Sequence, residues 1–107
     1  MELKLTQTDN GKSIEIQQED VIKLSLKENP STGYRWTVDK SSDEALVLQS
    51  SEFVSPENPK FGEGGVRVFE FRENKAVTTH IQLKHWREWE GDTSIIDRFA
   101  VTLLVKD

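Results

Sequence analysis

Hydrophobic and polar residues alternate along most of this 107-residue chain. The pattern is clearest over residues 77–84 and 99–105, where every second side chain is hydrophobic or Thr. A period of two places successive side chains on opposite faces of an extended strand, whereas an amphipathic helix requires a period near 3.6. No segment fits the helical period better than the alternating one. The sequence therefore predicts an all-β fold.

Eight candidate strands can be drawn from this alternation. They span residues 2–8, 12–18, 20–27, 34–39, 45–54, 66–73, 76–85 and 95–106. Short strands at this spacing are typical of an immunoglobulin-like sandwich of two antiparallel sheets. The chain has no cysteine, so packing must hold the core without a disulfide, and we expect Trp36 on a central strand to fill part of it. Residues 1–107 are predicted to form a single domain.

Proline and glycine are concentrated in three of the predicted connections. All three prolines and five of the six glycines fall within Glu28–Gly33, Ser55–Gly65 and Trp86–Ser94. The sixth, in Asn10-Gly11, is typical of a tight hairpin turn. The three connections follow the third, fifth and seventh predicted strands. If each strand runs opposite to the one before it, every second connection emerges at the same end of the sandwich. We therefore expect three neighbouring loops on a rigid scaffold, an arrangement that often serves binding.

Composition excludes several kinds of partner. The formal charge is −5, with 14 basic and 19 acidic residues, which argues against binding to a nucleic-acid backbone. No apolar run approaches the ~18–20 residues of a membrane span, and we predict neither nucleic-acid nor membrane binding. The first residues lack the layout of a signal peptide. The protein is expected to be cytoplasmic if Met1 is the native start, and periplasmic or secreted if a leader has been removed.

Residues that could carry enzyme chemistry are few. The only imidazoles are His80, which by parity faces solvent, and His85, which lies at a strand end beside Trp86. Five positions apart on a strand, they point to opposite faces and make a poor metal site. No strained Gly-x-Ser-x-Gly turn is present. We predict no catalytic residue, metal or cofactor, and keep a small hydrolase using His85 as a remote alternative.

Each of the three loops has features of a recognition surface and a simpler structural interpretation. Asn29-Pro30-Ser31-Thr32-Gly33 is slim and stiff, but it is equally a plain turn with an Asx-type bond from Asn29. Gly62-Glu63-Gly64-Gly65 exposes main-chain groups for pairing, or forms a flexible hairpin. Trp86-Arg87-Glu88-Trp89 is rich in residue types that dominate binding hot spots, although one indole, Trp86 rather than Trp89, is expected to cap the core. Two exposed indoles would also suit a non-enzymatic module that binds a glycan or a cell-surface partner.

Together, these motifs resemble those of the chagasin family of proteinaceous inhibitors of papain-like cysteine peptidases. Asn29-Pro30-Ser31-Thr32-Gly33-Tyr34 is similar to the family's Asn-Pro-Thr-Thr-Gly-Tyr/Phe loop, and Gly62-Glu63-Gly64-Gly65 matches its Gly-x-Gly-Gly loop. Arg87-Glu88-Trp89 resembles its Arg-Pro-Trp loop, with Glu88 in place of proline. The order and spacing of the motifs agree over essentially the whole chain.

The resemblance implies an immunoglobulin-like inhibitor that is reversible and noncovalent and is not an enzyme. Loops 29–34, 55–65 and 86–94 would together occlude the cleft of a papain-like cysteine peptidase, and the inhibitor is expected to be a monomer. The residues that the resemblance assigns to peptidase binding are Asn29, Pro30, Ser31, Thr32, Gly33, Tyr34, Gly62, Glu63, Gly64, Gly65, Arg87 and Trp89.

Overall fold

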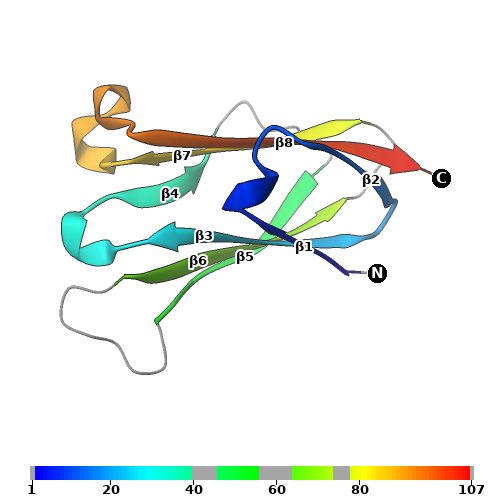
Figure 1. Cartoon of the computed structure of the whole chain (residues 1–107), viewed down its shortest axis with the longest axis horizontal. Helices are drawn as coiled ribbons and strands as arrows, with labels where there is room; N and C mark the ends of the chain where they lie inside the picture. The colour runs from blue at the N-terminus through cyan, green and yellow to red at the C-terminus, as the bar shows by residue number, and fades with distance from the viewer. Residues whose placement is uncertain (1, 40–45, 56–63, 74–77, 107) are drawn as a thin grey trace.

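Two four-stranded sheets form the protein (Figure 1), seen in a computed structural model that describes residues 2–39, 46–55, 64–73 and 78–106. Sheet A has the strand order β1-β3-β6-β5, and sheet B has the order β2-β8-β7-β4. The strands are β1 (Glu2–Thr6), β2 (Ser13–Gln17), β3 (Val21–Glu28), β4 (Arg35–Val38), β5 (Leu46–Val54), β6 (Gly65–Glu73), β7 (Thr79–Trp86) and β8 (Asp97–Lys106). Each predicted strand overlaps one of these, which confirms the all-β sandwich.

The sheets are mixed, so the expectation of purely antiparallel sheets is wrong at two places. The pairs β3–β6, β5–β6, β4–β7 and β7–β8 are antiparallel. The N-terminal strands instead pair in parallel, β1 with β3 and β2 with β8. Both parallel pairs lie at a sheet edge, where a strand has only one neighbour to satisfy.

The predicted hairpin at Asn10-Gly11 is also wrong. Gly11 does have a positive φ of 83°, but β1 and β2 belong to different sheets. The backbone N–H of Gly11 donates to the carbonyl of Ala100 at 2.7 Å, and the Asn10 side chain accepts from the Ala100 N–H at 2.8 Å. The turn therefore carries the chain from sheet A to the β8 side of sheet B.

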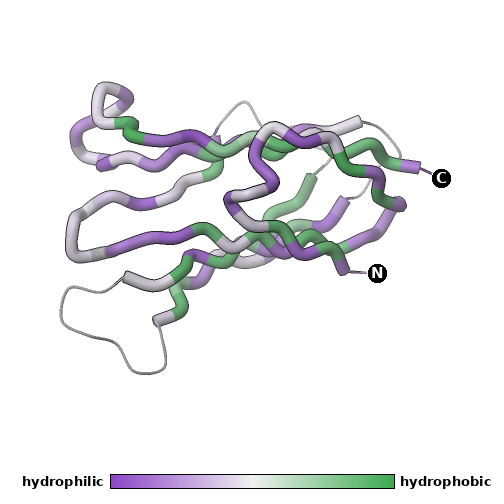
Figure 2. Tube along the Cα trace, in the orientation of Figure 1, coloured by the Kyte–Doolittle hydropathy of each residue, from purple (hydrophilic) through white to green (hydrophobic). Residues whose placement is uncertain are grey.

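The core lies between the two sheets. Its buried hydrophobic residues are Leu5, Ile16, Ile22, Leu24, Leu26, Trp36, Phe69, Phe71, Ile81, Leu83, Phe99, Val101 and Leu103. Hydrophobic segments run along the strands, whereas the tip between β3 and β4 is neutral in hydropathy (Figure 2). Trp36 fills the core as expected, with 3% of its surface exposed, although β4 is an edge strand of sheet B and not a central one.

The first and third of the three predicted loops lie at one end of the sandwich, and the strand ends that flank the second, Val54 of β5 and Gly65 of β6, lie at the same end (Figure 1). We call residues 29–34 the first loop, 55–65 the second loop and 86–94 the third loop. The first loop crosses from sheet A to sheet B, while the second and third each connect neighbours within one sheet. Glu28 at the end of β3 pairs with Gly65 at the start of β6, and Arg35 pairs with Trp86. Among the described residues, there is no helix with the length and apolar character needed to span a membrane.

Candidate functional site

The first loop is braced by hydrogen bonds within itself. A 3-10 helix, η2 (Pro30–Thr32), forms its tip. The Asn29 Oδ1 accepts from the Ser31 backbone N–H at 3.2 Å and from the Ser31 hydroxyl at 2.7 Å, which confirms the Asx-type bond. The Thr32 hydroxyl donates to the Asn29 carbonyl at 2.8 Å. With Pro30 also fixing its own φ, the loop loses little conformational entropy when it binds a partner.

The third loop is closed by a buried hydroxyl. It contains two 3-10 helices, η3 (Glu88–Glu90) and η4 (Asp92–Ser94), joined by Gly91 at a φ of 77°. The Ser94 Oγ accepts from the Arg87 N–H at 2.9 Å and lies within hydrogen-bonding distance of the carbonyls of Arg87 and Gly91, at 2.9 and 2.7 Å. One side chain thus ties both ends of the loop together.

Arg87 connects the third loop to the first. Its Nε and Nη2 donate to the Thr32 carbonyl at 3.2 and 3.1 Å. Its Nη1 pairs with the Glu90 carboxylate at 3.1 Å, and the guanidinium carbon lies 4.5 Å from the centre of the Tyr34 ring. The guanidinium is therefore engaged within the protein, where it holds two loops together.

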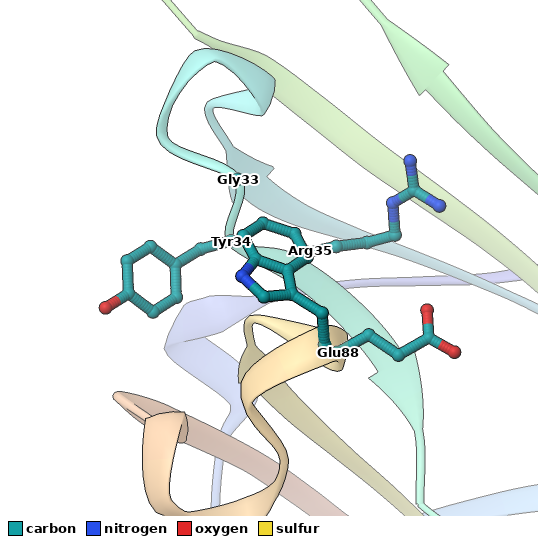
Figure 3. A pocket seen from close by; sticks show the side chains of 5 residues that line it. Gly33, Tyr34, Arg35 and Glu88 are labelled. Atoms are coloured by element: carbon teal, nitrogen blue, oxygen red, sulfur yellow. The ribbon is translucent and has the colours of Figure 1, made fainter.

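Trp89 extends from the third loop over the first. Its indole is 72% exposed, yet the ring edge approaches Gly33 so closely that a Cβ there would lie 2.6 Å from the Trp89 Cη2. Gly33 also has a φ of 81°, a conformation that favours glycine. Beside the indole is a pocket of about 370 Å³ lined by Gly33, Tyr34, Arg35, Glu88 and Trp89. Tyr34 extends to one side of it, while Arg35 and Glu88 extend to the other (Figure 3).

The second loop reaches the first through closely packed backbone. A Cβ on Gly64 would lie 2.7 Å from the Glu28 carbonyl, and one on Gly65 would overlap the Val54 carbonyl. Glycine is therefore required at both positions. Gly62 and Glu63, the other two predicted residues of this loop, lie outside the described residues.

His85 lies beneath the first loop, where it cannot serve as a base. Its ring stacks on Trp36 at a centroid distance of 4.7 Å and contacts Tyr34 edge-on at 5.9 Å. The Nε2 atom is buried and has no hydrogen-bond partner among the residues with described positions. Burial lowers the pKa of His85, against smaller opposing effects from Glu28, Asp97 and a hydrogen bond to the Tyr34 backbone. This packing removes the hydrolase alternative, because a general base must reach its substrate.

The sequence argued against a metal site at the two histidines and left open a glycan-binding platform made of two indoles. His80 is exposed, as expected, and its Nδ1 lies 3.1 Å from the Thr102 hydroxyl. Within the described ranges, no group of three or more His, Cys, Asp or Glu side chains could hold a metal ion. Trp86 does not join Trp89 in a two-indole platform, because the Lys84 Nζ lies 3.6 Å from its ring centre and Thr37 accepts from its Nε1.

Two charged residues at this end were not predicted as part of the site. Glu28 and Arg67 form an ion pair of 2.9 Å between Oε1 and Nη2. The alternation of the strands could have identified both residues. Glu28 lies on the same buried face of β3 as residues 22, 24 and 26, and Arg67 lies on the same face of β6 as Phe69 and Phe71. A charged residue at an inward position requires a buried partner.

Comparison with known proteins gives one consistent result. The family model described as Chagasin family peptidase inhibitor I42 matches residues 15–103. The chain is 31% identical to Amoebiasin-2 of Entamoeba histolytica over 103 residues (95% of this chain and 84% of the relative), and 26% identical to Chagasin of Trypanosoma cruzi over 107 residues (96% and 97%). The crystal structure of the cysteine protease inhibitor EhICP2 from Entamoeba histolytica superposes with a TM-score of 0.85 at 24% identity, covering 98% of this chain and 95% of that one. The chain therefore belongs to the chagasin family of peptidase inhibitors, which are not enzymes.

Proposed function

We propose that this protein is a reversible, noncovalent inhibitor of papain-like cysteine peptidases that occludes the active-site cleft with its three loops. The observation that carries the proposal is the contact between loops from both sheets at one end of the sandwich. Arg87 bonds to Thr32 across the first and third loops, and Gly64 packs on Glu28 between the first and second. Loops that brace one another in this way form a preorganised surface.

The first loop is assigned the central role. It is the one of the three that crosses between the sheets. Gly64, at the described end of the second loop, packs against Asn29, and Arg87 of the third loop bonds to Thr32. Its tip carries the small, exposed side chains of Ser31 and Thr32. We assign this tip, with Asn29, Pro30 and Gly33, to the centre of the cleft, where Thr32 would approach the catalytic cysteine and histidine.

The flanking loops are assigned complementary contacts. Residues 62–65 would pair through main-chain groups with one side of the cleft, and Trp89 would cover apolar surface on the other. Tyr34 and Arg87 support that second flank, with Arg87 holding the third loop against Thr32. The chain has no cysteine to form a covalent adduct with the peptidase, so binding is expected to be reversible. We further propose one inhibitor domain over residues 1–107, acting as a monomer without nucleic acid or membrane.

An inhibition assay tests this function. The purified protein is titrated into papain with a fluorogenic peptide substrate, and a serine and a metallopeptidase serve as controls. We expect loss of papain activity that is restored on dilution, with the two controls unaffected. Full papain activity at micromolar inhibitor would refute the proposal.

A further inference from the structure

A buried ion pair lies at the base of the first and second loops. The Glu28 carboxylate accepts from Arg67 Nη2 at 2.9 Å and from Nε at 3.2 Å, both at Oε1. Side-chain exposure is 1% for Glu28 and 14% for Arg67. An ion pair this deep is stable only if further hydrogen bonds satisfy its remaining atoms.

Further hydrogen bonds join the two strands that flank the first loop. The second oxygen of Glu28, Oε2, accepts from the Trp36 backbone N–H at 2.9 Å, just after the first loop. The indole N–H of Trp36 donates to the Lys27 carbonyl at 2.9 Å, just before that loop. These two bonds connect sheet A with sheet B across the base of the first loop.

The same pair borders the second loop. Glu28 pairs in register with Gly65, and its carbonyl lies directly against Gly64. Arg67 follows two positions later on β6, and its guanidinium lies 5.9 Å from the centre of the Phe53 ring on β5. Glu28 and Arg67 thus lie at the strand ends from which both loops begin or to which they return, beneath the proposed binding surface.

We infer that Glu28 and Arg67 are positioning residues for inhibition, because their ion pair sets the placement of Gly64 and Gly65, where the second loop ends, relative to the first loop. This inference rests on the proposed function. The pair does not touch the peptidase. It acts through Gly64, Gly65 and the ends of the first loop, as Arg87 does between the first and third loops.

The variant Glu28→Gln tests this inference, with Glu15→Gln as the matched control. Gln keeps the size of Glu28 but removes its charge, whereas Glu15 pairs with Lys106 at the surface. The unfolding midpoint of each variant is measured first, so that inhibition is compared under conditions in which every variant is folded. We expect Glu28→Gln to raise the Ki for papain about tenfold or more and Glu15→Gln to leave it unchanged.

Two readouts separate positioning from a purely structural role. In the free protein, NMR amide signals of Gly64, Gly65 and residues 31–33 should shift or broaden in Glu28→Gln and not in Glu15→Gln. When Glu28→Gln is combined with Gly64→Ala, the increase in Ki should be smaller than the product of the two single increases, because both substitutions disturb one contact. When Glu28→Gln is combined with Trp89→Ala, the increase in Ki should equal the product of the single increases.

A lowered unfolding midpoint with unchanged Ki and unchanged loop amides would overturn the inference. If Glu28→Gln does not fold, Arg67→Lys is tested in its place. Lysine keeps the positive charge but cannot donate from both Nε and Nη2 to Glu28. The same changes in Ki and in the amide signals are expected. If the wild-type protein does not inhibit papain, the proposed function fails, while the NMR comparison still decides whether the pair positions the loops.

Discussion

Trp89→Ala is the most informative substitution at the proposed binding surface. The residue is 72% exposed, and it extends from the third loop with its ring edge over Gly33. Its removal opens space above Gly33 but leaves the core untouched. Because substitutions on the surface rarely alter stability by much, we expect the free energy of unfolding to change by less than about 1 kcal/mol.

The effect on binding follows from the free area of the side chain. A tryptophan carries up to about 250 Å², so roughly 180 Å² of Trp89 remains available to a partner. Covering about half to nine-tenths of that area, at about 25 cal/mol per Å², is worth roughly 2–4 kcal/mol. We therefore expect the Ki of Trp89→Ala for papain to be roughly 30- to 1,000-fold higher than that of the wild type.

The assay compares Ki values from progress curves with a fluorogenic substrate and checks folding by chemical denaturation. Trp86→Phe is the matched control, because Trp86 is an aromatic residue nearby whose ring lies against Lys84. Its Ki should stay within about twofold of the wild type. If Trp89→Ala inhibits as well as the wild type, the third loop does not contact the peptidase and its assignment is wrong.

Three further predictions concern Arg87, Gly33 and His85. Arg87→Lys loses the paired bonds to the Thr32 carbonyl, so the Ki should rise about tenfold; an unchanged Ki would contradict the bridging role. Gly33→Ala meets both a positive φ and the Trp89 ring, and denaturant unfolding should show a loss of at least about 1 kcal/mol; a neutral result would refute this packing. The pKa of His85 is lowered by burial, so as pH falls below its ordinary value near 6.5 the unfolded chain takes up a proton before the folded one. Stability should then fall by at most about 1.4 kcal/mol per pH unit, and the slope should lessen in His85→Phe; an equal slope in that variant would assign the loss to other groups.

Local pattern was sufficient to predict the strands but not their partners. Alternation identified all eight strands because burial of one face is a property of neighbouring residues. The turn at Asn10-Gly11 shows the limit of this approach. Its glycine conformation was predicted, yet the next strand pairs with β8, about 90 positions away in the chain. Such pairing depends on contacts that are distant in sequence, and nothing in the turn itself encodes them.

The site was predictable where a motif is self-contained. The Asx-type bond of Asn29 and the exposure of Trp89 follow from residue type and position. The function of Arg87 within the protein does not, because the carbonyl that it contacts belongs to Thr32. Glu28 and Arg67 could have been noticed as charges at inward positions, although their pairing with each other required the register of β3 and β6.

The central claim is that the three loops bind as one surface, and an NMR map with labelled inhibitor and papain tests it most directly. We predict that the backbone amides of Asn29 and of residues 31–34, 64–65 and 87–91 are perturbed together, while those of β1 and β2 are not. Papain whose cleft is already occupied by a covalent small-molecule inhibitor should produce no such change. Perturbations centred on the outer face of either sheet, or a map that persists with the occupied cleft, would contradict the account.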